Sequence, residues 1–543
     1  MKFRINLWIC LFVLPGMSVY SQKKQTKLVV GIVVDQMRND YIYRYWNRYG
    51  EGGFKRLVNE GFYCKNAHYN YVPTYTGPGH SSIYTGTTPR THGIIANEWY
   101  SREQGKEIYC VADSKAKTVG STSEAGKMSP HNQLSTTIGD ELLLFSSGKS
   151  KVIGVALKDR SSILPVGHAK GSAAYWFDDA TGNFISSDWY MSALPEWAWK
   201  YNEKKSAKAF LEKGWNTLYP VETYSAGIAD NNSYELSPNK KENPVFPYEY
   251  KSFIEKGSYG ILKATPWGNT ITKEFAIEVL KAEKLGQDEH ADMLCISFST
   301  PDYVGHSFGI RSVEIEDIYL RLDKELEELL NALDKEVGKD NYSLFLTADH
   351  GAADVAAYLM AQKIPAGYIK EEKLIKDIKT FCKTEFGDSL VLSVSNQQVF
   401  LNESRVVALK LNQQDVENKL AAALVKMQGI GEAYSSYSLK YEAKGNGAYM
   451  ALIANGFNFK RSGNVAFTYL PGWLDIQQTG TTHGAAYSYD TNVPLIFFGA
   501  GINKGESLKR QYVTEIAPTI SVLLNNPFPN GCVSDPIESV LRK

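Results

Sequence analysis

The sequence predicts an α/β fold: a mostly parallel central sheet, flanked by helices on both faces, with inserted cap regions. Three observations favour this fold class. Five short runs are apolar at nearly every position, as in strands that are buried on both faces of a sheet. Segments with helical periodicity lie among these runs. Polar residues follow the runs directly, which is where an open α/β sheet binds its ligand.

The five predicted strands can be read in chain order. They are KLVVGIVVDQM, KVIGVAL, DMLCISFSTPD, YSLFLTADHG and VPLIFFGAG. The charged residues that end or follow them are Asp35, Lys158, Asp159, Arg160, Asp302, Asp349 and His350. We therefore expect the functional site at the ends of these strands.

The clearest predicted helix covers 314–337. Its apolar residues recur at helical spacing, and they are Ile315, Ile318, Leu322, Leu326, Leu329, Leu333 and Val337. A second helix is expected near 415–427 and a third near 514–524. These segments alternate with the strands and would cover the sheet.

Two stretches interrupt the alternation within a single predicted domain of residues 22–543. Residues 171–289 are rich in Trp, Tyr, Asn, Pro and Lys, as in AAYWFDD and LPEWAWKYNEKK, and show little strand–helix alternation. We expect this aromatic-rich insertion to cap the edge of the sheet. A second insertion is expected over 363–472.

Composition and charge exclude two classes of partner. The chain has 543 residues, of which 43% are hydrophobic and 22% charged, as in a globular protein. Its 59 basic and 59 acidic residues cancel. Nucleic acids and membrane surfaces are bound through a basic excess, so no nucleic-acid-binding surface is expected.

The first 21 residues are typical of an export signal. Lys2 and Arg4 precede the apolar run LWICLFVLPGM, and small residues precede a cleavage site before Gln22. The run is too short to span a bilayer, and no later stretch reaches the required length. We expect an exported protein, either periplasmic or extracellular, with no membrane span.

The remaining cysteines form no recognisable framework. They are Cys64, Cys110, Cys295, Cys382 and Cys532. Their odd number and scattered spacing are not typical of a disulfide scaffold or of a thiolate metal site. One or two bridges stay open as an alternative in an oxidising compartment.

Acids and histidines at strand ends and in Gly-rich turns supply a set of metal ligands. They are Asp35, Asp302, His306, Asp349, His350 and His483. His306 follows Asp302 by one helical turn, so both side chains can point the same way. Each residue alone is more often a cap or a turn former. Together they suit a pair of Zn²⁺ ions, although Mn²⁺ or Co²⁺ would accept the same ligands. Two such ions promote in-line displacement at phosphorus.

The run YVPTYTGPGHSSIYTG predicts a loop that becomes a helix with a hydroxyl at its start. Pro78 suits a first helical turn, and the glycines allow close approach of a phosphate. A threonine at this point, bound to a metal, would attack phosphorus directly. The helix N-terminus favours negative charge. Spacing does not choose between Thr74 and Thr76.

Seven motifs in one order resemble a known family. They are VVDQMR, YVPTYTGPGHSSIYTGTTPRTHGI, NEWY, LKDRSSILPVGH, STPDYVGHSFG, TADHG and GTTHGA. The set resembles the alkaline phosphatase superfamily and, more narrowly, its phosphate-irrepressible, PafA-type secreted bacterial monoesterases. The resemblance covers nearly the whole chain after the export signal.

The resemblance implies a role for each matched residue. One zinc would be surrounded by Asp35, Thr76, Asp349 and His350, with Thr76 as the nucleophile that forms a phospho-threonine. The other zinc would be held by Asp302, His306 and His483 and would activate the hydrolytic water. The phosphoryl group would be bound by Asn97, Lys158 and Arg160, whose charge suits a dianion.

The implied protein is a monomeric alkaline phosphatase that hydrolyses small phosphate monoesters and releases inorganic phosphate. A phosphodiesterase or nucleotide pyrophosphatase of the same superfamily is the first alternative, because it would share the two-zinc core. A non-catalytic surface binding protein on this fold is the second. A sulfatase is disfavoured because no Cys or Ser lies in its modification motif.

Overall fold

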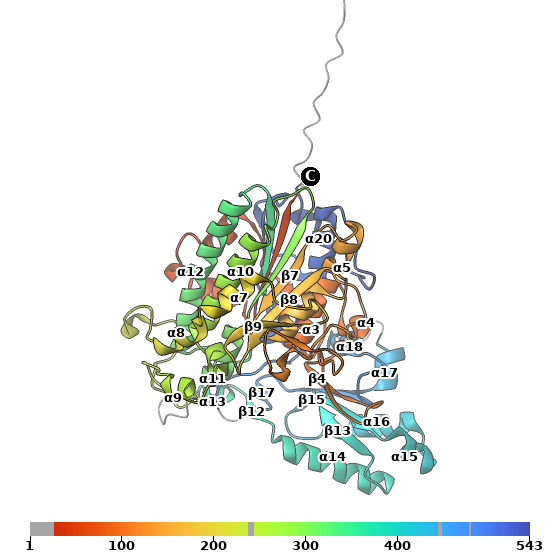
Figure 1. The fold of residues 1–543 in the computed structure, drawn as a ribbon. Helices are drawn as coiled ribbons and strands as arrows, with labels where there is room; N and C mark the ends of the chain where they lie inside the picture. The colour runs from red at the N-terminus through yellow and green to blue at the C-terminus, as the bar shows by residue number, and fades with distance from the viewer. Residues whose placement is uncertain (1–25, 237–243, 444–447, 477–478, 543) are drawn as a thin grey trace, which may run out of the picture.

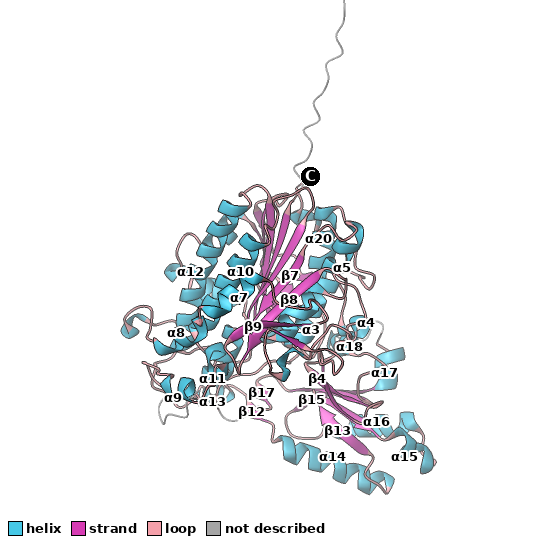
Figure 2. Ribbon diagram, in the orientation of Figure 1, coloured by secondary structure: helices cyan, strands magenta, loops and turns pink. Residues whose placement is uncertain are grey.

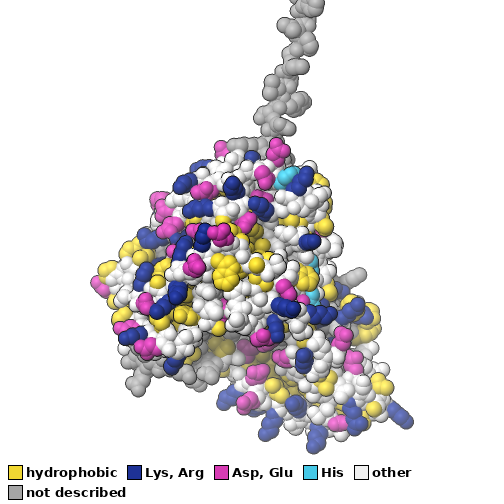
Figure 3. Space-filling model, in the orientation of Figure 1, with side chains coloured by type: hydrophobic (Ala, Val, Ile, Leu, Met, Phe, Trp, Pro, Cys, Tyr) yellow, Lys and Arg dark blue, Asp and Glu magenta, His cyan; other side chains and the backbone are white. Residues whose placement is uncertain are grey.

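A computed structural model describes residues 26–236, 244–443, 448–476 and 479–542 (Figure 1). The predicted export signal, residues 1–21, lies outside these ranges, so export stays a prediction. No helix in the described ranges is long and apolar enough to cross a bilayer. Acidic and basic side chains are interspersed over the face in Figure 3, as expected from the balanced composition.

The fold-class prediction is confirmed by a ten-stranded sheet with helices on both faces (Figure 2). Its central strand is β1 (Leu28–Val34), which pairs in parallel with β10 (Asp292–Phe298) and β11 (Tyr342–Thr347). β7 (Val152–Ala156) extends the parallel part beside β10. Every residue of these four strands is buried, which explains their unbroken apolar sequence.

The sheet becomes antiparallel toward its edges. β19 (Leu495–Gly499), the fifth predicted strand, runs antiparallel to β11 and pairs in turn with β2 (Phe62–Cys64). At the other side, β8 (Ser172–Asp178) is parallel to β7, and β9 (Asn183–Ser187) is antiparallel to β8. The first part of the predicted 171–289 insertion therefore adds strands to the sheet, and the extent of the insertion stays a prediction.

Two helix layers cover the sheet (Figure 1). One contains α10 (Pro266–Ala282) and α12 (Val313–Glu336), the helix predicted over 314–337. The other contains α3 (Thr76–Thr85), α5 (Ile138–Phe145), α6 (Asp159–Val166) and α20 (Ile516–Leu524), the last predicted near 514–524. The predicted apolar positions of α12 from Ile315 to Leu333 are all buried.

Residues of the predicted 363–472 insertion build a second, smaller sheet, seen at the lower right of Figure 1. Its strands lie in the order β13 (Val391–Ser395), β14 (Gln398–Leu401), β16 (Val465–Tyr469) and β15 (Ile430–Ser435). α14 (Glu371–Phe386) and α16 (Gln413–Leu424), predicted near 415–427, share a separate apolar core with it. The insertion boundaries stay a prediction.

Within the described ranges all five cysteines are free thiols, namely Cys64, Cys110, Cys295, Cys382 and Cys532. Four of the five are buried. The bridges left open by the sequence are therefore not formed in this structure.

Gly31, in the middle of β1, sets how closely α3 approaches the sheet. A Cβ at this position would collide with the hydroxyl of Tyr84, which belongs to α3, and would lie 2.6 Å from Cζ of Phe345. A side chain here would push the aromatic rings outward, and with them the helix that begins at Thr76.

We expect Gly31→Ala to reduce the free energy of unfolding by about 1–3 kcal/mol, because overpacking in a dense core strains its neighbours. Thermal unfolding would measure the loss. Adding Tyr84→Phe, which removes the nearest colliding atom, should restore part of it. Unchanged stability of Gly31→Ala would show that this packing is not tight.

Candidate active site

Parallel neighbouring strands bring the predicted ligands to one edge of the sheet. Asp35 directly follows β1, and Asp349 and His350 follow β11. β10 leads into α11 (Thr300–Phe308), which carries Asp302 and His306 one turn apart. The sixth ligand, His483, arrives on a loop far along the chain.

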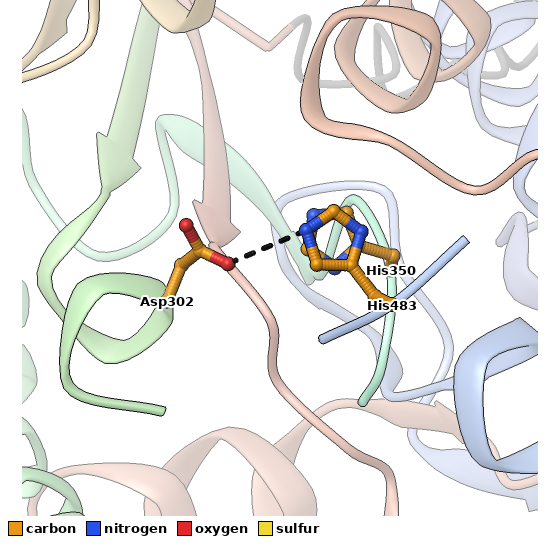
Figure 4. A group of neighbouring side chains, drawn as sticks. All are labelled: Asp302, His350 and His483. Atoms are coloured by element: carbon orange, nitrogen blue, oxygen red, sulfur yellow. Dashed lines mark ion pairs between the residues drawn. The ribbon is translucent and has the colours of Figure 1, made fainter. Parts of the chain in front are cut away.

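The six residues form two adjoining clusters. The ligand atoms of Asp35, Asp349 and His350 lie within 4.8 Å of one another, and so do those of Asp302, His350 and His483 (Figure 4). His306 joins the second cluster, with Nε2 3.1 Å from Oδ1 of Asp302. The resemblance assigned His350 to one metal only, whereas the structure places it within reach of both clusters.

The three histidines all direct the same ring nitrogen into the site. Nδ1 donates to a backbone carbonyl in each: His306 to Thr481 at 2.8 Å, His483 to Thr74 at 2.7 Å and His350 to Gly351 at 3.0 Å. A carbonyl only accepts, so the proton is on Nδ1 and the lone pair on Nε2. This arrangement is typical of metal-bound histidine.

Buried atoms without partners show that the first cluster fits a cation. Oδ1 of Asp35, Oδ2 of Asp349 and Nε2 of His350 are buried and have no hydrogen-bond partner. All three residues are fully buried. Burial raises the pKa of Asp349 to about 7, and burial together with the charge of Asp349 raises the pKa of Asp35. A divalent cation would satisfy these acceptors and remove their mutual repulsion.

Lys158 lies between the clusters. Its Nζ donates to Oδ2 of Asp35 and to Oδ2 of Asp302, both at 2.6 Å. Burial opposes its charge, but Asp302 and Asp35 raise the pKa of Lys158 above its ordinary value. The resemblance implied a contact with the phosphoryl group, and the structure adds these two carboxylate partners.

Thr76 is the first residue of α3, and it is buried beside this edge. The N–H of Gly77 donates to Oδ1 of Asn97 at 2.8 Å, so Asn97 also lies at the helix start. Gly79 allows α3 to approach Asp349 closely, because a Cβ at this position would be 2.7 Å from Cβ of Asp349. Thr74 precedes the helix, and its carbonyl holds His483.

Arg160 belongs to a half-buried chain of polar groups that the sequence did not reveal. Its Nη1 donates to the hydroxyl of Tyr109 at 2.9 Å, and that hydroxyl donates to Oδ1 of Asp159 at 2.5 Å. Nε of Arg160 is buried without a partner. Tyr109 ends β5 (Lys106–Tyr109), a strand far from α6 in sequence, so no local signal marks it.

Gln36 is a second residue that sequence reasoning missed. Its φ of 64° lies in the left-handed region, which is costly for a residue with a side chain. The backbone N–H donates to Oδ1 of Asp349 at 3.2 Å, and Nε2 donates to Oδ1 of Asp302 at 2.6 Å. Gln36 thus orients one carboxylate of each cluster. Its position directly after Asp35 was the available signal.

Comparison with known proteins identifies the family. A family model described as type I phosphodiesterase / nucleotide pyrophosphatase matches residues 29–490. Alkaline phosphatase PafA of Elizabethkingia meningoseptica is 42% identical over 520 residues, or 95% of each chain. A crystal structure of wild-type alkaline phosphatase PafA superposes with a TM-score of 0.91, covering 95% of this chain and 99% of that one.

Two further relatives match over almost their whole length. Alkaline phosphatase PhoV of Synechococcus elongatus is 42% identical over 561 residues and 100% of each chain. A protein of Myroides odoratus named calcium-transporting ATPase is 40% identical over 540 residues and 98% of each chain.

The chain belongs to the type I phosphodiesterase and nucleotide pyrophosphatase family of the alkaline phosphatase superfamily. Within it, the chain is a PafA-type alkaline phosphatase, and hence a hydrolase. This membership confirms the predicted family and sets aside the alternative of a non-catalytic binding protein.

Because His350 borders both clusters, we expect His350→Ala to weaken metal binding at both. The loss of metal affinity should exceed the ~10–100-fold that follows when only a hydrogen-bond partner of a metal ligand is removed. Elemental analysis after dialysis against a weak chelator would measure it. His131→Ala is the matched control, since His131 is an exposed histidine bonded to Ser129. Equal metal content in both variants would contradict the shared role.

Proposed function

We propose that this enzyme hydrolyses phosphate monoesters with two Zn²⁺ ions and a covalent phospho-threonine at Thr76. One observation carries the proposal: two adjoining Asp/His clusters border the N-terminus of α3, where Thr76 is the first residue. Asp35, Asp349 and His350 would hold one ion with Thr76, and Asp302, His306 and His483 the other. When bound, such ions lower the pKa of a hydroxyl or water and stabilise charge on the phosphoryl group.

In this reaction Oγ1 of Thr76 attacks phosphorus and the ester oxygen leaves. Water then attacks the phospho-threonine on the opposite side and releases inorganic phosphate. α3 begins at Thr76, and its helix dipole favours the negative charge of the transferred group. Positioning and charge stabilisation carry most of the rate in such a loose transition state.

The remaining donors of three side chains support binding of the phosphoryl oxygens. Oδ1 of Asn97 accepts from Gly77, so its NH₂ group is left to donate to the substrate. An ammonium has three donors, and two of those on Lys158 are used by Asp35 and Asp302. Nε of Arg160 is free while Nη1 is held by Tyr109.

These donors favour a monoester over a diester. Lys158 and Arg160 contribute two positive charges, and a monoester dianion presents three terminal oxygens to them. A diester presents one fewer charged oxygen. Phosphodiesterase activity stays the alternative, because the matching family model is described by that activity. The ratio of kcat/KM for a monoester and a matched diester would distinguish the two.

We expect Thr76→Ala to reduce monoester turnover by about 10³-fold or more, because the nucleophile is lost. Metal content and thermal stability should be largely retained. Trapping of phospho-enzyme with labelled substrate at low pH would test the intermediate. Thr74→Ala is the matched control. It removes a neighbouring hydroxyl but keeps the backbone carbonyl that accepts from Nδ1 of His483. Near-normal turnover of Thr76→Ala would remove Thr76 from the mechanism.

We expect Arg160→Ala to reduce kcat/KM for a monoester by about 10–100-fold, the cost of a charge-assisted hydrogen bond, and to affect a diester less. Tyr109→Phe keeps the guanidinium but removes the hydroxyl that accepts from it. We therefore expect kcat/KM to fall less than in Arg160→Ala, and again more for the monoester than for the diester. Steady-state kinetics on both substrates would measure this. Equal losses on the two substrates would contradict the assigned role.

A further inference from the structure

A two-residue turn in the smaller sheet has a backbone conformation that its second residue does not favour. Asn396 and Gln397 join β13 to β14, where Ser395 pairs with Gln398. Their φ values of 51° and 59° both lie in the left-handed region. Hairpin turns of this kind usually carry Asn followed by Gly, because glycine adopts the conformation without strain. Asn396 suits the turn, whereas the side chain of Gln397 is present at a cost in backbone strain.

The turn is covered by other parts of the chain, although most hairpin turns face solvent. Gln397 is 7% exposed and Asn396 is half-buried. The N–H of Phe467, in β16, donates to the carbonyl of Gln397 at 2.9 Å, so the backbone of the turn is held by the smaller sheet itself. The two amide side chains are then available to bond outside this sheet, and both do so.

Gln397 supports the loop that carries His483. Its Nε2 donates to the carbonyl of Gly484, the residue after His483, at 3.1 Å, and this bond is buried. The same loop packs against Tyr75, since a Cβ at Gly484 would lie 2.9 Å from that ring. Tyr75 precedes Thr76 and lies edge-on to the imidazole of His483, with ring centroids 5.5 Å apart. Gln397 thus helps to fix the loop of His483 against the start of α3.

Asn396 supports the strand that begins directly after Asn97. Its Nδ2 donates at 2.7 Å to the carbonyl of Glu98, which begins β4 (Glu98–Ser101). β4 is in contact with β13 of the smaller sheet (Figure 1). The position of Asn97 therefore depends on the smaller sheet as well as on its own bond to the first turn of α3.

We propose that the turn of Asn396 and Gln397 positions the active site by fixing Asn97 and His483 together. The inference rests on the proposed function, in which Asn97 binds the phosphoryl group and His483 holds a metal ion. Both turn residues act through backbone carbonyls, so they are positioning residues. The smaller sheet, with its separate apolar core, supplies the rigid support. The strain at Gln397 places an amide donor where glycine would offer none.

Gln397→Gly separates the role of the side chain from that of the fold. Glycine relieves the backbone strain and gives the favoured Asn-Gly turn, so Tm should stay within about 3 °C of that of the parent protein. We expect Zn²⁺ at the cluster that contains His483 to bind about 3–10-fold more weakly, the effect of one hydrogen bond. Competition with a chelator would measure this on the holoenzyme. Gln397→Met, which keeps the bulk but has no N–H donor, should show the same loss.

Lys410→Gly is the matched control. Lys410 is an exposed residue of the same predicted insertion with a φ of 56°, so glycine relieves strain there too. This variant should keep the Zn²⁺ affinity and the turnover of the parent protein. Unchanged Zn²⁺ affinity in both Gln397 variants, or an equal loss in Lys410→Gly, would overturn the role of Gln397. Normal Zn²⁺ binding by His483→Ala would instead contradict the proposed function.

Asn396→Asp keeps the shape of the turn but replaces the NH₂ donor by an acceptor. We expect kcat/KM for a phosphate monoester to fall about 3–10-fold with Zn²⁺ affinity unchanged. The loss should disappear when Asn97→Ala is already present, because Asn396 acts through Asn97. Additive losses in the double variant would overturn the role of Asn396. Unchanged turnover of Asn97→Ala alone would instead remove Asn97 from the proposed phosphoryl site.

Discussion

Negative charge buried at one edge of the sheet is the constraint on which the rest of the structure depends. Asp35, Asp302 and Asp349 lie at neighbouring strand ends and are almost inaccessible to solvent. Burying several carboxylates costs more free energy than any protein keeps in reserve, unless cations compensate them. Lys158 supplies one positive charge. The remaining negative charge suits divalent cations at the two candidate metal clusters.

The orientations of the ligand side chains are fixed by hydrogen bonds within the protein itself. Carbonyl groups fix the tautomers of three histidines, and Gln36 fixes a carboxylate in each cluster. These contacts require Gln36 to adopt the left-handed backbone conformation, which is unfavourable for a residue with a side chain. The helix α11 adapts to it, since a Cβ at Gly305 would collide with the amide oxygen of Gln36. Strain of this kind persists where the surroundings over-determine it.

The sequence predicts the parts of the site that follow from strand burial. A strand that is apolar on both faces must end where a charge begins, so Asp35, Asp302 and Asp349 could be located from the pattern alone. Tyr109 could not, because only tertiary packing brings β5 to α6. The two partners of Lys158 lie 123 and 144 residues away in the sequence, and they come within reach because β10 pairs with both β1 and β7. The strands at 172–187 were missed because their aromatic composition resembles that of a surface insertion.

The two halves of the site differ in how they are held, and this difference suits the proposed order of events. Asp35, Asp349 and His350 follow the central strands and are fully buried, so the half beside Thr76 is rigid and dry. The side chain of His306 is 37% exposed, and His483 comes from a loop. Of the six ligand residues only His306 is substantially exposed, so the site opens to solvent on its side. In the proposed reaction, a nucleophile beside the buried half would be protected until substrate binds, and the water that ends the cycle would enter from the side of His306. The outer half therefore needs support from outside the sheet. The N–H of Leu236 donates to the carbonyl of Ser307, next to His306, at 2.8 Å. The carbonyl of Tyr234 accepts from the N–H of Gly480, on the segment that carries His483, also at 2.8 Å.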